Sequence, residues 1–342
     1  MACHLHSNTS QIFSYLSEIY FSLSMAKGSS LCTTNDSFSG EEGAIPLLDY
    51  SKLVSSDPIL RSLAIQDLGQ ACVDYGFFIV RNHAIPGTVI NGIIDKLFEF
   101  FDLPEDYKHK YDTKDPTDLI RWGKGNINHV SREFVKMAVH PTFHCPSNPH
   151  GFSEILQEYT QKVRELGIQL LGGISMALGL EKSYIEKKMN LESGYDFFTA
   201  NDYPSRQHSE NRIGQFAHID PGLIILIIQN VSGGLQVKHN GKWLNVNLQP
   251  DWIFVNVADH LEILTNGKYK SAVHRVVVNN EVRRATLPLF LGPSLDTVVK
   301  PAPEFTDDSN PPAYVGITYK HYLEYNNFHV IDGKSCLNQI RI

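Results

Sequence analysis

Residues 213–228 have the sequence IGQFAHIDPGLIILII, which predicts two β-strands joined by a tight turn. The first strand ends near His218, and the tripeptide DPG that begins at Asp220 turns the chain into an unbroken apolar run, residues 223–228. His218 and Asp220 are two residues apart, so both side chains face the same way on an extended backbone. The apolar run predicts a strand that is buried on both faces, between a β-roll and helices.

A third candidate metal ligand, His274, stands in a segment rich in β-branched residues, 271–278, which predicts another strand. Two imidazoles and one carboxylate can occupy one face of an octahedral metal ion and leave the opposite face open, as in non-haem Fe(II) oxygenases. His274 lies far along the chain from Asp220, so it reaches the same site only if the sheet closes on itself. The three residues therefore predict a metal site inside a closed β-structure.

Two further polar residues, Arg284 and Thr286, begin a predicted strand that covers residues 284–291. On a strand these two side chains point together, which offers a guanidinium fork and a hydroxyl group to one carboxylate. Pro288 interrupts the same strand, and proline donates no hydrogen bond to a sheet. We therefore expect an edge or a bulge at this position, beside the pocket.

The spacing His-x-acid does not by itself indicate a metal site, because 15 histidines and 37 acidic residues in 342 positions predict about 1.6 such pairs by chance. Two other pairs occur. His208 and Glu210 lie in a polar run that is typical of a solvated loop, and His260 and Glu262 precede a turn signal. We expect neither of these two pairs to bind the metal.

Short motifs along most of the chain resemble those of the plant 2-oxoglutarate- and Fe(II)-dependent dioxygenases, the flavanone hydroxylase and flavonol synthase-like superfamily. The resemblance covers roughly residues 44–325. The motifs that carry it are IPLLD (45–49), ACVDYGFF (71–78), NH (82–83), NDYP (201–204), HIDPG (218–222), GGLQV (233–237), NGKYKS (266–271), HRV (274–276) and RAT (284–286).

The resemblance implies an α+β fold with a double-stranded β-helix core (a jelly roll, cupin-like) and an N-terminal helical region packed around it. It implies that Fe(II) is held by His218, Asp220 and His274. The ordered strands of such a roll leave a tapered interior for a ligand.

The resemblance also implies a site for 2-oxoglutarate as co-substrate. Arg284 and Thr286 would bind its distal carboxylate, and Tyr203 and Asn201 would contact its other end. Thr286 stands where the family generally has serine, and because the hydroxyl group is kept we expect binding to be kept. The sequence YPSRQH (203–208) also departs from the loop that is usual in the family.

The substrate pocket is expected to contain aromatic side chains. Phe290 matches a position that lines the pocket in the family, and we add Phe216, Phe134 and Phe198 as further candidates. These residues suggest a low-polarity substrate that contains rings.

Composition narrows the class of protein. The chain is 42% hydrophobic and 20% charged, with a net charge of -7 and no run of basic residues, which argues against binding to nucleic acid. Its 5 cysteines are few and widely spaced, as is typical of cytoplasmic thiols, and no apolar run is long enough for a membrane span. We expect a cytoplasmic monomer that acts on a small molecule.

The chain divides into four predicted regions. Residues 1–43 are expected to be a flexible extension without a secretory or transit signal, and Met25 is a candidate internal start. Residues 44–190 are expected to be mostly helical, because apolar spacing of three and four recurs between residues 57 and 185. The remaining expectations are a jelly-roll core at 195–295, with hairpin signals at 232–234 and 240–241, and a C-terminal helix and tail at 296–342, the helix near 314–327.

The expected activity is hydroxylation or desaturation of a low-polarity plant specialised metabolite, such as a flavonoid, phenolic, alkaloid, or steroidal or terpenoid compound. The reaction would convert 2-oxoglutarate and O2 into succinate and CO2, with ascorbate as the reductant. Two alternatives remain open. One is an ascorbate-dependent oxidase of the ethylene-forming branch, and the other is a non-catalytic jelly roll that binds a small ligand.

Overall fold

The computed structural model describes residues 40–113, 115, 118–125, 132–205, 213–278, 281–326 and 335–342. Most strands of this part fall into an eight-stranded sheet with the order β1-β2-β10-β7-β12-β5-β4-β3 and a four-stranded sheet with the order β6-β11-β8-β9. The large sheet consists of β1 (Leu47–Asp49), β2 (Phe77–Arg81), β3 (Ile120–Gly125), β4 (Arg132–His140), β5 (Asp196–Tyr203), β7 (Ile224–Gln229), β10 (Ile253–Val257) and β12 (Arg284–Leu291). The small sheet consists of β6 (Ile213–His218), β8 (Leu235–His239), β9 (Lys242–Asn245) and β11 (His274–Val277).

Strand β7 shows how the two sheets and the helices pack. Ile224, Leu226 and Ile228 belong to the hydrophobic cluster formed with the helices, whereas Ile225 and Ile227 belong to a second cluster shared with the small sheet. Every residue of the strand is buried, and a fully buried isoleucine contributes about 2 kcal/mol to folding. The predicted strand with two buried faces is confirmed, as is the jelly-roll core.

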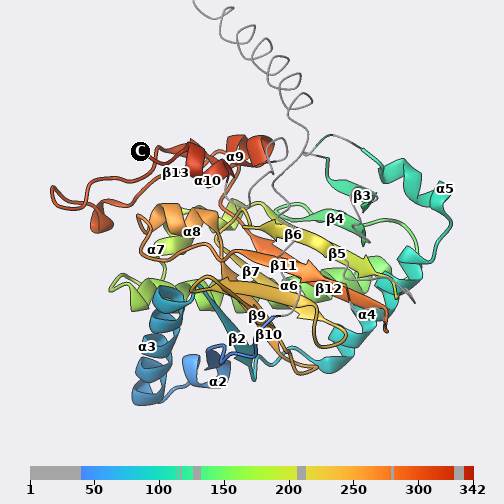
Figure 1. Ribbon diagram of the computed structural model, residues 1–342, viewed down its shortest axis with the longest axis horizontal. Helices are drawn as coiled ribbons and strands as arrows, with labels where there is room; N and C mark the ends of the chain where they lie inside the picture. The colour runs from blue at the N-terminus through green and yellow to red at the C-terminus, as the bar shows by residue number, and fades with distance from the viewer. Residues whose placement is uncertain are drawn as a thin grey trace, which may run out of the picture. The chain divides into compact units, whose positions relative to one another are not determined.

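Three long helices accompany the large sheet, and all three were predicted from apolar spacing. They are α3 (Pro58–Asp74), α4 (Gly87–Phe101) and α6 (Phe152–Ala177). Helix α3 begins at Pro58 because the Asp57 side chain accepts a hydrogen bond from the Ile59 N–H group at 2.8 Å. In Figure 1, α3 and α4 lie on the flanks of the sheets. Shorter helices are α2 (Tyr50–Leu53), α5 (Glu105–Lys108) and α7 (Tyr184–Lys188).

The helical interpretation of residues 57–185 is wrong in three places, because β2, β3 and β4 lie within that range. Strand β2 contains the short apolar run FFIV (77–80), which is buried throughout and has no period that separates a strand from a helix. The helix-rich part of the chain therefore supplies one complete edge of the large sheet, the β3–β4 hairpin. Residues 40–342 form one compact unit, and the four-region division remains a prediction.

The C-terminal part contains α8 (Asp259–Leu264), β13 (Val298–Val299), β14 (Ile317–Thr318), α9 (Tyr319–Asn326) and α10 (Ser335–Gln339). In Figure 1, β13, α9 and α10 are grouped beside α8. The helix predicted near 314–327 begins only at Tyr319, because Tyr314 pairs with Arg341 and residues 317–318 form β14.

The two hairpin signals have different outcomes. Asn240 and Gly241 have φ angles of 48° and 80° and join β8 to β9 in a two-residue hairpin, as predicted. The signal at 232–234 is wrong, because it connects β7 of the large sheet to β8 of the small sheet.

The expected N-terminal extension is described only at its end, and residues 1–39, with the candidate start Met25, lie outside the described residues. Glu41 pairs with the small sheet: its N–H group donates to the Trp243 carbonyl at 2.7 Å, and its carbonyl accepts from the Asn245 N–H group at 3.0 Å. Among the described helices, none combines the length and the apolar character needed to span a bilayer.

Candidate active site

The three predicted metal ligands meet where β6 and β11 pair. His218, the last residue of β6, lies opposite His274, the first residue of β11. Asp220 follows β6 and reaches both rings: its Oδ1 lies 3.5 Å from Nε2 of His218, and its Oδ2 lies 3.4 Å from Nε2 of His274. The donor atoms all lie within 4.8 Å of one another. This spacing fits one metal ion bound by two nitrogens and one oxygen.

Backbone carbonyl groups fix the orientation of both imidazoles. Nδ1 of His218 lies 2.7 Å from the Phe216 carbonyl, and Nδ1 of His274 lies 3.0 Å from the Ala272 carbonyl. Because a carbonyl only accepts, each Nδ1 must donate, which leaves a lone pair on each Nε2. In this structure Nε2 of His218 accepts a hydrogen bond from the Gln215 side-chain amide at 2.9 Å. Burial, and then the neighbouring His274, lowers the pKa of His218 to about 4, so this ring is in the neutral form that binds metals.

The Asp220 carboxylate is held by a residue of the large sheet that the sequence reading missed. Asn256 on β10 donates from Nδ2 to Oδ2 of Asp220 at 3.2 Å. The turn after Asp220 requires glycine, because Gly222 has a φ angle of +110° and a Cβ atom there would lie 2.8 Å from the Leu291 carbonyl oxygen. These contacts position the carboxylate relative to both sheets.

The other two His-x-acid pairs do not join this site. His260 and Glu262 are fully buried in α8, and the predicted turn follows them at residues 265–267. Nδ1 of His260 accepts from the Gly222 N–H group at 3.0 Å, and the residue therefore supports the turn behind Asp220. His208 and Glu210 lie outside the described residues. In the part of the chain that the structure describes, His218, Asp220 and His274 form the one group with metal-ligand spacing.

A second part of the site has the properties of an anion-binding site. Arg284 is 1% exposed, and Nη2 donates to Oε1 of Gln229 at 3.3 Å. Nε and Nη1 of Arg284 and the hydroxyl of Tyr203 are buried and have no hydrogen-bond partner. A buried guanidinium group without an anion is costly, so these orphaned donors fit a ligand carboxylate.

The four residues predicted to bind the co-substrate are brought together by pairing between two adjacent strands. Arg284 pairs with Tyr203, and Thr286 pairs with Asn201, on the adjacent strands β12 and β5. Nδ2 of Asn201 donates to Oγ1 of Thr286 at 3.0 Å, and Oδ1 of Asn201 remains without a partner. The structure thus brings all four residues to one face of the large sheet. Their roles toward 2-oxoglutarate remain predictions.

The connection at residues 232–234 packs directly against this arginine. Gly234 has a φ angle of +81°, and a Cβ atom there would lie 3.1 Å from Cζ of Arg284 and 2.8 Å from the Val277 carbonyl oxygen. Only glycine allows the backbone to approach so closely. The requirement for glycine at position 234 is therefore explained by its close contact with Arg284.

Both parts of the site open into one cavity of about 260 Å³. The ligand triad, Asn201, Tyr203 and Thr286 line the cavity, together with the predicted pocket residues Phe134 and Phe290. Three cationic residues that the sequence reading missed also line it: Arg121, Arg132 and Lys136. Their β3 and β4 strands were read as helical, which concealed that these side chains alternate toward the site.

Two of the aromatic residues that were predicted to line the pocket, Phe216 and Phe198, do not line it. Phe216 is 45% exposed and does not line the cavity, because a register shift in β6 places Gln215 on the cavity side next to His218. Phe198 is buried on the opposite face of β5, where its ring centre lies 5.8 Å from that of Tyr159 in α6.

Pro288 lines the cavity, but the expected edge or bulge is wrong. Strand β12 is central, between β5 and β7, and its register is continuous on both sides. On the β7 side, Pro288 is paired with Ile227. On the β5 side, the register is the same before and after the proline, but residues 287 and 288 of β12 form no pairs with β5. The proline therefore removes a ladder contact inside the sheet, on the side that faces the β5 residues of the site.

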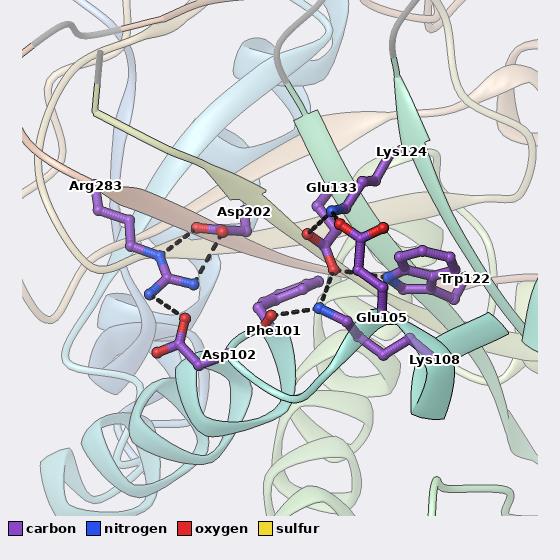
Figure 2. A network of polar contacts seen from close by, with 9 residues as sticks. All are labelled: Phe101, Asp102, Glu105, Lys108, Trp122, Lys124, Glu133, Asp202 and Arg283. Atoms are coloured by element: carbon purple, nitrogen blue, oxygen red, sulfur yellow. Dashed lines mark hydrogen bonds and ion pairs between the residues drawn. The ribbon is translucent and has the colours of Figure 1, made fainter. Parts of the chain in front are cut away.

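Two polar networks attach the strands of the site to the helices (Figure 2). Oε1 of Glu133 on β4 accepts from Lys108 Nζ at 2.7 Å and from Trp122 Nε1 at 2.8 Å. Arg283, next to Arg284, donates to both carboxylate oxygens of Asp202 at 2.9 and 3.0 Å and to Asp102 at 2.8 Å. The first network fixes the β3–β4 hairpin, and the second fixes the start of β12.

Comparison with known proteins gives consistent matches over both halves of the chain. Residues 194–293 match the family model of the 2OG-Fe(II) oxygenase superfamily, and residues 45–158 match the model described as non-haem dioxygenase in morphine synthesis N-terminal. The chain is 40% identical over 304 residues to 2-oxoglutarate-dependent dioxygenase 19 of Oryza sativa subsp. japonica, covering 87% of this chain and 90% of the relative.

Other relatives have more specific names. Flavanone 3-dioxygenase 2 of Oryza sativa subsp. japonica is 34% identical, with 88% of each chain covered. Thebaine 6-O-demethylase of Papaver somniferum is 32% identical, with 87% of this chain and 85% of the relative covered. Among solved structures, JOX2 in complex with 2OG, Fe and JA has a TM-score of 0.79 at 26% identity, covering 94% of this chain and 97% of that chain.

Proposed function

The chain belongs to the plant-type 2-oxoglutarate- and Fe(II)-dependent dioxygenases, and from this we propose that it oxidises a small ring-containing metabolite in the cavity beside His218, Asp220 and His274. Its cofactor is Fe(II) and its co-substrate is 2-oxoglutarate. When bound, this pair supplies an oxidising chemistry that converts 2-oxoglutarate and O2 into CO2 and succinate while the substrate is oxidised. The observation that supports the proposal is one cavity that is lined by the ligand triad and by Tyr203 and Thr286, the two residues beside the buried Arg284, whose Nε and Nη1 have no partner among the described residues.

In this proposal His218, Asp220 and His274 hold the metal on one side and leave its other side open to the cavity. The carbonyl groups of Phe216 and Ala272 keep the two rings in the binding tautomer. The amide of Asn256 donates to Oδ2 of the aspartate and so fixes the orientation of the carboxylate. The protein contributes a rigid, preorganised donor set.

Arg284 would bind the distal carboxylate of 2-oxoglutarate, since its Nε and Nη1 are buried without a partner among the described residues. The resemblance implies that Tyr203 contacts the other end of 2-oxoglutarate; we propose instead that its unpaired hydroxyl binds beside Arg284, its cross-strand partner. The hydroxyl of Thr286 would share this carboxylate, and Asn201 would position that hydroxyl through the hydrogen bond between them. Buried, charge-assisted hydrogen bonds of this kind select a carboxylate strongly.

The remaining walls of the cavity would bind the apolar body of the substrate. They include Phe134, Ile227, Leu235, Val276 and Phe290. These apolar side chains favour a substrate whose skeleton has apolar faces, while the polar residues of the same cavity fix its orientation. The names of the relatives, which include a flavanone dioxygenase and an alkaloid demethylase, support a plant specialised metabolite as the substrate. We propose hydroxylation or desaturation of that skeleton, with ascorbate as reductant, by a cytoplasmic monomer.

The test is substrate-dependent succinate release by the purified chain with Fe(II), ascorbate and 2-oxoglutarate. The panel contains flavanones, alkaloids, aromatic and terpenoid acids, amino acids and straight-chain alkanes, with Asp220→Ala as the inactive control. We expect release only with ring-containing compounds. Release with amino acids or alkanes alone would overturn the proposed substrate class. Oxidation that needs ascorbate but not 2-oxoglutarate would instead favour the ethylene-forming branch, and ligand binding without any turnover would favour a binding module.

A further inference from the structure

Three cationic side chains line the cavity from one edge of the large sheet: Arg121 on β3, and Arg132 and Lys136 on β4. Within the described part of the chain, none of the three forms an ion pair with an acidic residue. Asp220 is the one acidic side chain on the cavity wall, and it faces the two histidines. The neighbouring Glu133 points to the opposite face of β4, where it binds Lys108 and Trp122 (Figure 2).

The cations have little direct compensation: burial lowers the pKa of Arg121, and the charges of Asp118 and Asp115 offset this only in part, without an ion pair among the described residues. Nε of Arg121 is buried without a hydrogen-bond partner. Arg132 donates to the neutral Gln215 side chain at 2.7 Å. Nζ of Lys136 lies 3.9 Å from the centre of the Phe197 ring. Burial, and then the charge of Arg121, lowers the pKa of Lys136 to about 8, which is the direction expected where positive charges are crowded together.

Arg121 and Lys136 lie away from the arginine assigned to the co-substrate. They are cross-strand neighbours, and Lys136 also pairs with Thr199 on β5. Arg284 pairs with Tyr203, four residues farther along the same strand β5, which corresponds to roughly 13 Å at 3.3 Å per residue. Arg121 and Lys136 are therefore separate from Arg284 along the sheet, and they line the same cavity as the metal-ligand triad.

The charge of the bound co-substrate does not account for Arg121 and Lys136. The aspartate reduces the charge of Fe(II), and Arg284 binds the distal carboxylate of 2-oxoglutarate in the proposed function. Arg121 and Lys136 would remain unpaired in a partly desolvated cavity, which is unfavourable unless a ligand supplies an anion. Phe290 lines the cavity, and the Phe197 ring stacks on it with 4.2 Å between the ring centres, so this wall offers an aromatic surface to a flat apolar skeleton.

We propose that the substrate of this enzyme is a ring-containing carboxylic acid whose carboxylate is bound by Arg121 and Lys136, away from Arg284. This inference rests on the proposed function and specifies its substrate class. Arg121 supplies the planar guanidinium fork that matches a carboxylate, and Lys136 supplies a second charge across the strand pair. A skeleton anchored here would share the cavity with His218, Asp220 and His274, the residues that would hold the metal.

The test compares binding of acids with that of their neutral primary amides, so that shape is held constant. Chain loaded with Mn(II) and saturating 2-oxoglutarate, which supports binding without turnover, is titrated calorimetrically with 1-naphthaleneacetate, trans-cinnamate and cyclohexylacetate and with the three amides. We expect at least one acid to bind more than about tenfold more tightly than its amide, a difference of about 1.4 kcal/mol. If no acid binds better than its amide, the inference is overturned.

Substitutions test whether Arg121 and Lys136 cause the preference for acids over amides. In Arg121→Gln and Lys136→Met the acid should lose most of its advantage while the amide binds as before, and Lys136→Arg should keep the advantage. Lys187→Met removes one charge from a side chain that is 73% exposed, and it should match the wild type. Retention of the full preference in both Arg121→Gln and Lys136→Met would also overturn the inference.

The same proteins with Fe(II) separate this inference from the proposed function. Tight binding of acids without any succinate release would contradict the proposed function but leave the acid site intact. Succinate release with neutral ring compounds only would support the function and contradict the acid site.

Discussion

Arg284 and Tyr203 are cross-strand partners on β12 and β5, and Cζ of Arg284 lies 4.9 Å from the centre of the Tyr203 ring. Both side chains are almost fully buried, and both have donors without a protein partner. Burial lowers the pKa of Arg284, and the neighbouring Tyr203 offsets this only in part. The pair is thus complete only with an anionic ligand, and this makes the co-substrate site testable by substitution.

Replacing Arg284 should chiefly weaken the affinity for 2-oxoglutarate. Arg284→Leu removes the charge and the fork, so we expect the apparent KM for 2-oxoglutarate to rise by more than about a hundredfold, or about 2.7 kcal/mol. Arg284→Lys keeps the charge and should cause a smaller increase. Steady-state kinetics at varied 2-oxoglutarate measure both, and an unchanged KM in Arg284→Leu would rule out the assigned role.

Removing Asp220 should abolish turnover without unfolding the protein. Asp220→Ala leaves two imidazoles as the donor set, and we expect activity to fall by at least about a hundredfold. Circular dichroism and the thermal midpoint of the metal-free protein should stay close to the wild type. An active Asp220→Ala protein would show that the metal is held elsewhere.

Asn256 should affect metal affinity through Asp220. Asn256→Ala removes the hydrogen bond to Oδ2, and the loss of such an outer contact typically costs about 10- to 100-fold in metal affinity. Competition with a metal chelator gives the dissociation constant. Asn247→Ala is the matched control, because Asn247 binds the surface residue Glu42. Equal metal affinity in both variants would contradict the positioning role.

The preference for acids over amides should depend on pH through Lys136. Its pKa is lowered to about 8 by burial and by Arg121, so the charged form predominates below pH 8 and is lost as pH rises through this value. We expect the acid-to-amide affinity ratio to fall between pH 7 and pH 9. Arginine stays charged throughout this range, and His218, with a pKa of about 4, is already neutral. Lys136→Arg should therefore show a flat ratio, and a sloping ratio in that variant would point to another group.

Arg283 should stabilise the fold and leave the co-substrate site formed. Arg283→Gln removes the paired hydrogen bonds to Asp202, a carboxylate that is 5% exposed, and the contact to Asp102 (Figure 2). We expect a loss of about 2 kcal/mol in the free energy of unfolding, which urea titration measures. Arg81→Gln is the control, since its contact to Asp49 is 3.5 Å and exposed. The account fails if the two variants lose the same stability.

The metal ligands and the co-substrate arginine could be predicted from the sequence because their spacing is local and their strands have simple apolar patterns. His218 and Asp220 close one strand, and Arg284 and Thr286 begin another. In each pair the period of two residues on a strand decides which side chains share a face. The return of His274 to the site was predictable only through the expected closure of the sheet.

The rest of the site depends on pairing between distant strands, which leaves little local signal. Arg121 and Lys136 meet only because β3 and β4 form a hairpin, within a segment whose spacing was read as helical. The place of Phe216 is decided by a register shift in β6 that changes which residues face the cavity. The role of His260 behind the Asp220 turn was not predicted, because the packing of α8 against that turn cannot be read from adjacent residues.

The most direct test counts Fe(II) ions per chain by anaerobic equilibrium dialysis, with and without 2-oxoglutarate. The account predicts one ion per chain in the wild type, tighter binding when 2-oxoglutarate is present, and a large loss of affinity in His218→Ala, Asp220→Ala and His274→Ala. Full Fe(II) affinity in any of these three variants, or no stoichiometric binding by the wild type, would contradict it.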